Sequence, residues 1–101
     1  MVERLTFDNF VDKIRETKLP VLVDFYSDSC MPCKRMTGVI AQIQEEYQGK
    51  VLVYKANINF EKELIEKYAI LSAPTFLIFK SGEVTARLSG VQQKDTQDIL
   101  F

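Results

Sequence analysis

The sequence predicts an α/β domain in which a central mixed β-sheet is flanked by helices on both faces. Apolar runs of strand length alternate along the chain with segments whose apolar residues recur at helical spacing. One run, residues 21–26, is apolar on both alternating faces except at Asp24, as expected of a central strand that is covered on both sides. The predicted order is β-α-β-α-β-α-β-β-α, within a single domain that spans residues 1–101.

The first elements are short. Residues 2–5 can form a strand, and Thr6 is a candidate N-cap for the helix that follows. The apolar residues of this helix recur at helical spacing: Phe7, Phe10, Val11 and Ile14. Pro20 ends the helix and opens the central strand 21–26.

A longer helix follows the central strand. It is predicted from Cys33 to Tyr47, and its apolar residues mark one face: Met36, Val39, Ile40, Ile43 and Tyr47. Gly49 supplies the C-terminal stop. We expect a weak point or bend at Gly38, because glycine inside a helix costs roughly 1 kcal/mol relative to alanine.

The second half of the chain predicts three strands and two short helices. They are, in order, a strand at 51–58, a helix capped by Asn59, strands at 75–79 and 84–88, and a helix at 94–101. Ser81-Gly82 is a two-residue connection typical of a β-hairpin. Because strands and helices alternate through most of this order, the pattern favours a sheet with helices on both faces.

The composition indicates a soluble protein without a nucleic-acid surface. Apolar residues make up 47% of the chain, and 13 basic and 14 acidic residues give a formal net charge of -1, without the basic excess that nucleic acid requires. No apolar run approaches the roughly 18 residues of a membrane span. The first residues lack the layout of a signal peptide. We therefore expect a cytoplasmic protein, in which two cysteines favour a redox or metal role over a structural disulfide.

The two cysteines lie in the stretch Cys30-Met31-Pro32-Cys33, where the central strand leads into the long helix. Thiols at this spacing can close a small disulfide ring or remain a dithiol, and the pattern is typical of a redox motif. The helix N-terminus and Lys34 both favour a thiolate at Cys30. The alternatives are two incidental buried thiols or zinc, and with no histidine a four-ligand zinc site would need a dimer.

Four motifs follow one another along the chain: the strand with Asp24, the Cys30 to Cys33 stretch, Ala73-Pro74-Thr75 and Phe79-Lys80-Ser81-Gly82. Nearly the whole chain thereby resembles the thioredoxin family. The resemblance implies the thioredoxin fold and a protein-disulfide oxidoreductase that reduces target proteins and contributes to cell redox homeostasis. It implies that Cys30 attacks, that Cys33 resolves, and that no cofactor is bound. A separate thioredoxin reductase, using NADPH and flavin, would restore the dithiol of a monomeric protein.

Three positions depart from the family pattern. Ser29 stands where the family usually has tryptophan, Met31 where it has glycine, and Gly38 where it has a helix-kinking proline. The first two border Cys30, so they leave the reduction potential and the choice of partner open. The alternatives are a more oxidising disulfide oxidase or isomerase, and a binding module that uses the groove around Met31 and Pro74.

Two charged residues are candidates for proton transfer. Asp24 lies in an otherwise apolar strand, where burial raises the pKa of a carboxyl group. The resemblance implies that Asp24 helps to move the proton on and off Cys33, and a structurally paired carboxylate is the alternative. Lys55, on a neighbouring strand, is a candidate partner that would oppose the rise in pKa.

The resemblance also implies a substrate-binding surface, formed by Ser29, Met31, Pro32, Ala73, Pro74 and Gly90. We expect a cis Ala73–Pro74 bond that leaves the backbone of Ala73 free to pair with an extended substrate segment. Simpler interpretations remain open: Pro32 as a helix-start proline, Met31 as a tolerated exposed residue, and Gly90 as a turn glycine. Thr75 is assigned to strand and turn structure.

Overall fold

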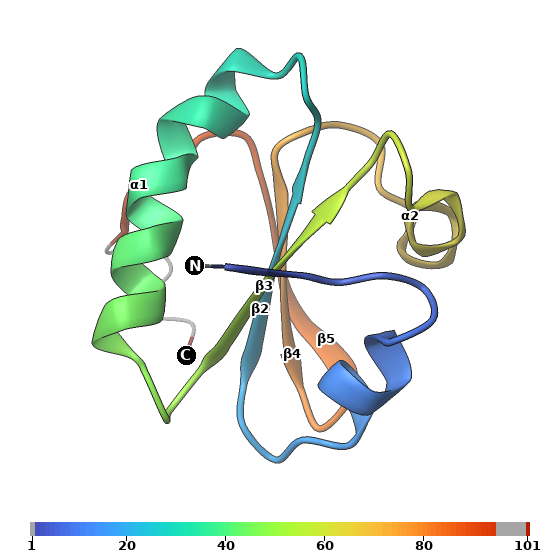
Figure 1. Ribbon diagram of the computed structural model, residues 1–101, viewed down its shortest axis with the longest axis vertical. Coiled ribbons are helices and arrows are strands. Elements are labelled where there is room, and N and C mark those ends of the chain that lie inside the picture. Colours follow the sequence, from blue (N-terminus) through green and yellow to red (C-terminus); the bar gives the residue numbers. More distant parts are fainter. Residues whose placement is uncertain (1, 95–100) are drawn as a thin grey trace.

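The chain folds into a five-stranded mixed sheet with helices on both faces (Figure 1), as shown by a computed structural model that describes residues 2–94 and 101. The strands are β1 (Glu3–Arg4), β2 (Val21–Tyr26), β3 (Leu52–Asn57), β4 (Thr75–Lys80) and β5 (Glu83–Ser89). They lie side by side in the order β1-β3-β2-β4-β5. Strand β2 pairs in parallel with β3 and antiparallel with β4, which confirms the predicted mixed sheet and its central strand.

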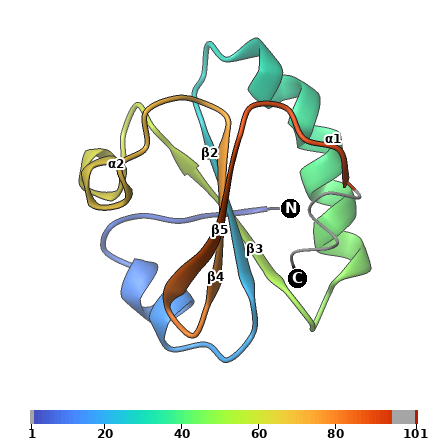
Figure 2. The same cartoon turned by 180° about the vertical axis from the view of Figure 1, so that it is seen from behind.

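Helices cover both faces of this sheet, as Figures 1 and 2 show from opposite sides. Helix α1 (Met31–Glu46) covers one face, while the short π-helical segment η1 (Val11–Arg15) and helix α2 (Lys62–Tyr68) cover the other. Among the described residues, none of these helices combines the length and the apolar character needed to cross a membrane.

The alternation of side chains along β2 creates two separate cores. Val21, Val23 and Phe25 pack in the core beneath η1 and α2, together with Ile14 and Leu64. The intervening β2 residue Leu22 instead packs in the core beneath α1; the other members of that core are Met36, Ile40, Ile43, Val51, Val53, Phe76 and Ile78. Successive residues of a strand point to opposite faces, so Asp24 also points toward α1.

The first predicted helix forms only in part. Segment η1 begins at Val11, after Phe10 rather than Thr6, and no side chain caps it. The N–H of Thr6 donates to Oδ1 of Asn9 at 2.8 Å, and the N–H of Asn9 donates back to the Thr6 carbonyl at 3.2 Å. The prediction of Thr6 as N-cap is wrong. Thr6 and Asn9 form a separate turn before the helical segment, which begins only at Val11.

The predicted cap of α2 is also wrong. Glu61, not Asn59, occupies the cap position, and its side chain makes no capping bond. Instead, Oδ1 of Asn59 accepts a hydrogen bond from the N–H of Asp28 at 3.2 Å. The side chain of Asn59 therefore serves a contact between two loops, which its position in the sequence does not reveal.

Helix α1 is longer and more regular than predicted. It begins at Met31, two residues before the predicted start, and continues without interruption through Gly38 to Glu46. Met36 and Ile40, on either side of Gly38, are buried against the sheet, so packing holds the helix together where propensity is weak. The expected weak point therefore does not break the helix.

The second half of the chain follows the prediction closely. Strands β3, β4 and β5 lie within one or two residues of their predicted bounds. Ser81 and Gly82 form the two-residue hairpin loop, with positive φ angles of 54° and 83°, as a type I′ turn requires. The predicted helix at 94–101 lies almost entirely outside the described residues.

Two glycine substitutions are expected to change stability in opposite directions. Gly38→Ala should raise the free energy of unfolding by roughly 1 kcal/mol, because the site is exposed within α1 and a Cβ there would meet nothing within 4 Å. Gly82→Ala should lower it by about 1–2 kcal/mol, because φ is +83° and the Cβ would lie 3.4 Å from the Arg15 Cα. Urea unfolding of both variants measures the difference, and an equal change in both would contradict this account.

Candidate active site

Cys30 and Cys33 form a disulfide at the start of α1, with their Cα atoms 5.2 Å apart. Cys30 occupies the N-cap position, and its Sγ accepts a hydrogen bond from the backbone N–H of Cys33 at 3.0 Å. Cys33 is buried, whereas Cys30 is partly exposed. The helix N-terminus therefore points a backbone donor at the sulfur of the more accessible cysteine, which stabilises a thiolate there after reduction.

Hydrogen bonds to the loop after β3 hold the residues just before Cys30. Oδ1 of Asp28 accepts from Nδ2 of the buried Asn57 at 3.0 Å, and the Asp28 N–H donates to Asn59. The N–H of Cys30 donates to the carbonyl of Ser27 at 3.3 Å. These hydrogen bonds join the segment before Cys30 to the end of β3 and the residues after it, so they hold the disulfide in place at the carboxyl end of β2.

Asp24 lies beneath α1, in the sheet face that the disulfide helix covers. It is only 7% exposed, and its Oδ1 has no hydrogen-bond partner among the described residues. Burial raises the pKa of this carboxyl group to about 7, and the positive charge of Lys55 opposes the rise. Burial removes water from the carboxylate, and no hydrogen bond to Oδ1 replaces it, so the charged form is disfavoured and the pKa rises.

Lys55 is held beside Asp24 by the register of the sheet. The two residues are direct neighbours in the parallel pairing of β2 with β3, so their side chains project to the same face. The Lys55 Nζ also lies 5.8 Å from the centre of the Tyr26 ring. The structure thus places the carboxyl group and the lysine that the sequence predicted as partners on neighbouring strands and on the same face.

One cavity joins the buried acid to the buried cysteine. Its volume is about 410 Å³, and Asp24, Cys33 and Lys55 all line it. The remaining lining residues are Val2, Tyr26, Ser27, Asp28, Lys34, Thr37, Ile40 and Ala41. The lining is mostly apolar, and a cavity of this size has room for several water molecules beside the polar groups of Asp24, Lys55 and Thr37. The carboxyl group of Asp24 and the side chain of Cys33 therefore face one shared cavity.

The loop before β4 completes this end of the molecule. The Ala73–Pro74 bond is cis, as expected, and Ala73 is partly exposed while Pro74 is buried. The N–H of Gly90 donates to the Pro74 carbonyl at 2.8 Å, so the loop after β5 lies against the proline loop. The Thr75 hydroxyl donates to the Ser72 carbonyl at 2.7 Å, in agreement with its assignment to turn structure.

Gln92 is a contributor that the sequence did not reveal. Its Nε2 donates to the carbonyls of Ser89 and Gly90, at 2.9 and 3.4 Å, and its N–H donates to Sδ of Met36 at 3.4 Å. These bonds tie the Gly90 turn to α1. No motif could have identified Gln92, because its acceptors are backbone carbonyls and a thioether that only folding brings near.

The predicted surface residues gather around the disulfide. Ser29, Met31 and Pro32 are exposed at the start of α1. Ala73 lies in the loop before β4, and Gly90 lies in the loop after β5. The pairing of Thr75 with Phe25 and with Ser89 brings these loops to the same end of the sheet as the cysteines.

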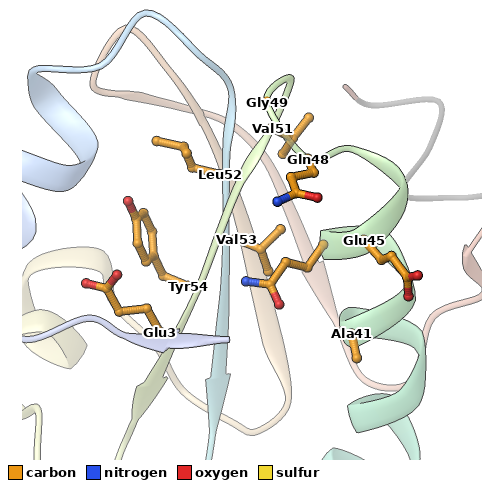
Figure 3. A pocket seen from close by; sticks show the side chains of 10 residues that line it. Glu3, Ala41, Glu45, Gln48, Gly49, Val51, Leu52, Val53 and Tyr54 are labelled. Carbon is orange, nitrogen blue, oxygen red and sulfur yellow. The ribbon is translucent and has the colours of Figure 1, made fainter. Parts of the chain in front are cut away.

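A second cavity, of about 640 Å³, lies away from the disulfide (Figure 3). It runs along β3 beside the C-terminal half of α1, and its lining, with Glu3 and Tyr54 at one end and Ala41 and Glu45 at the other, includes neither cysteine. Within the described part of the chain, no group of three or more histidine, cysteine, aspartate or glutamate residues is placed to hold a metal ion. The candidate active site is therefore the end of the sheet that carries the disulfide.

A surface disulfide at a helix N-terminus, with a buried acid behind it, defines a thiol–disulfide oxidoreductase. The family model described as Thioredoxin matches residues 1–99. Proteins named thioredoxin from Rickettsia felis and Rickettsia conorii are each 41% identical to this chain over 96 residues, which cover 95% of this chain and 91% of theirs. A thioredoxin from Rickettsia bellii is 38% identical over the same coverage. The chain belongs to the thioredoxin family and is a protein-disulfide oxidoreductase.

The stability of the oxidised protein is expected to depend on the ionisation of Asp24. Because the pKa rises from 3.8 to about 7 on folding, the folded state holds the proton more tightly, and stability falls as the pH rises from about 4 to 7. At 1.36 kcal/mol per pKa unit the loss reaches at most about 4 kcal/mol above pH 7. Asp24→Asn should remove it, so the variant should gain stability over the wild type between pH 5 and pH 8 in urea unfolding.

The matched control is Asp8→Asn, which changes an exposed carboxylate far from α1 in the sequence. The same pH series on this variant measures what removal of an exposed carboxylate does, and the pH-dependent gain of Asp24→Asn should exceed it. A constant difference between Asp24→Asn and the wild type would show that the carboxyl group of Asp24 titrates normally in the folded protein.

Proposed function

We propose that this protein reduces disulfides of target proteins in the cytoplasm, with Cys30 as the attacking thiol and Cys33 as the resolving thiol. The observation that carries the assignment of roles is the unequal exposure of the two cysteines at the start of α1. A target disulfide can approach Cys30 from solvent, whereas Cys33 is buried. The N–H of Cys33 that points at the Cys30 sulfur favours the thiolate on the residue that attacks first.

In the first step the Cys30 thiolate attacks one sulfur of the target disulfide. The target S–S bond breaks, a mixed disulfide forms between Cys30 and the target, and the other target sulfur leaves as a thiolate that takes a proton from solvent. Activation of the thiol contributes little by itself. A drop in thiol pKa from about 8.5 to about 7 raises the thiolate fraction roughly 16-fold but lowers its nucleophilicity about 6-fold.

In the second step Cys33 gives up its proton and attacks the Cys30 sulfur. The mixed disulfide breaks, the second target sulfur leaves as a thiolate, and the Cys30–Cys33 disulfide forms. Two electrons have then passed from the dithiol to the target. Because Cys33 is covalently held beside Cys30, this step is intramolecular, for which effective concentrations can reach about 10⁵ M or more.

Asp24 is the proposed acceptor of the Cys33 proton. Its carboxyl group shares a cavity with Cys33, and a pKa of about 7 populates both protonation states near neutral pH. An acid with an ordinary pKa would be a weaker base, and one with a much higher pKa would already hold a proton. The positive charge of Lys55 keeps the pKa of Asp24 from rising further, so we propose that Lys55 tunes the pKa of Asp24.

The reduced state must be restored from outside the chain. We propose a separate thioredoxin reductase as the partner, which would pass two electrons from NADPH through flavin to the disulfide of a monomeric protein. The family membership supports this proposal, together with the approach to Cys30 from solvent. The surface around Cys30 that Met31, Pro32, Ala73 and Gly90 form would receive both the reductase and the targets.

The direction of electron flow is expected to be that of a reductant. Equilibration with glutathione buffers, followed by alkylation and mass measurement, gives the reduction potential of the Cys30–Cys33 pair. We expect a value nearer the roughly -270 mV of thioredoxin than the roughly -180 mV of protein disulfide isomerase, a gap of about 4 kcal/mol. A value near -180 mV would instead identify the oxidising alternative that Met31 leaves open.

The assigned roles of the cysteines predict different outcomes for two serine variants. Cys30→Ser should abolish reduction of insulin disulfides, because no accessible nucleophile remains. Cys33→Ser should still attack but not resolve, so a mixed disulfide through Cys30 should accumulate and be visible by mass spectrometry. A binding module would keep its function in Cys30→Ser, and a mixed disulfide formed through Cys33 in Cys30→Ser would reverse the assignment.

A further inference from the structure

Exposed apolar side chains are concentrated at the end of the sheet that carries the disulfide. Among the described residues, the large apolar side chains that are more than half exposed are Met31, Phe60, Leu71 and Val91. All four lie in loops or helix starts at this end, because Tyr26 pairs with Asn57, Phe25 with Thr75, and Thr75 with Ser89. The concentration follows from topology rather than from proximity in the sequence.

The four side chains divide into two pairs on opposite faces of the sheet. Met31 is the first residue of α1, and Val91 precedes Gln92, which bonds to Met36 of the same helix. This pair belongs to the surface already proposed to receive the target. Phe60 and Leu71 instead flank α2, two residues before its first residue and three after its last. We call Phe60 and Leu71 the α2-flank pair.

The described part of the fold buries neither side chain of the α2-flank pair. Leu71 is 95% exposed and Phe60 is 67% exposed, while the core beneath α2 is filled by Leu64 and Ile70. Exposed apolar side chains grouped next to a reactive site are typical of a binding surface. The two residues are therefore available to a partner without any rearrangement of the core.

Both members of the pair are anchored to the loops that carry the chemistry. The N–H of Phe60 donates to the Asn57 carbonyl at 3.0 Å, and Asn57 in turn bonds to Asp28, two residues before Cys30. Leu71 lies three residues before Pro74, in the loop that faces an incoming substrate. Both members of the α2-flank pair therefore belong to loops that are joined to the loops of the site.

We propose that Phe60 and Leu71 form a second contact for the target polypeptide, which favours disulfides bordered by uncharged aliphatic or aromatic side chains. The inference rests on the proposed function and specifies its substrate class. Ser29, next to Cys30 in the chain, and Ala73, next to the cis proline, offer little apolar area. The α2-flank pair supplies apolar surface that these positions lack, and burial of such surface by the target stabilises the encounter.

The test uses two synthetic peptides, each with one intramolecular disulfide. One peptide has leucines on both sides of one cysteine, and the other has serines at the same positions. The second-order rate constant for reduction by the reduced protein is measured by thiol trapping. 5,5′-Dithiobis(2-nitrobenzoate) serves as a small disulfide that cannot reach beyond Cys30.

The wild type should reduce the leucine peptide about tenfold faster than the serine peptide. Leu71→Ser and Phe60→Ser should each lower the rate with the leucine peptide by about three- to tenfold, and should leave the serine peptide and the small disulfide unchanged. The matched control is Val84→Ser, which removes a partly exposed apolar side chain at the hairpin end of β5, opposite to the disulfide. This control should alter none of the three rates.

The outcomes separate this inference from the proposed function. If the wild type reduces neither peptide, the proposed function fails. If it reduces both and the two serine variants match it on the leucine peptide, the α2-flank pair does not contact the target. An equal loss on the small disulfide would also overturn the inference, as would sedimentation that shows a wild-type dimer lost in both variants, because the occupant would then be a second copy of the chain.

Discussion

The pairing of β2 on both edges, beneath helices on both faces, is the constraint on which the rest of the structure depends. It buries Asp24 in the face under α1. It also places Cys30 just beyond the carboxyl end of β2, at the start of α1. The same strand therefore sets the charge state of the acid and the exposure of the thiol. A surface strand could do neither, because water would solvate the carboxyl group and restore its ordinary pKa.

The disulfide end of the molecule is built from loops that support one another. The loop before α1 is bonded to the residues after β3, and the loop after β5 is bonded both to the Pro74 loop and to α1. Loops are normally the more mobile parts of a fold, so these bonds matter for a reaction in which the sulfurs must meet repeatedly. Both cysteines belong to one turn at the start of α1, next to these bonded loops.

Two of the three departures from the family pattern lie on the surface of this site. Ser29 and Met31 are exposed beside Cys30, whereas Asp24 and Lys55 retain their register beneath it. In the proposed function the buried residues serve the exchange chemistry, and the exposed residues beside Cys30 contact the partner. The replacement at Gly38 has less effect than its propensity indicates, because the buried residues around it hold α1 in place.

Much of this protein follows from the sequence alone. The spacing of apolar residues predicted the strands and the long helix, and the cysteine pair with Asp24 and Ala73-Pro74 indicated the family, because these signals are local or have fixed separations. The tertiary structure alone determined which loops meet, Asn59 with Asp28 and Gln92 with Met36, and it left Phe60 and Leu71 exposed on either side of α2. Such contacts join residues far apart in the chain through backbone groups and exposed surface, which leave no periodic pattern in a sequence.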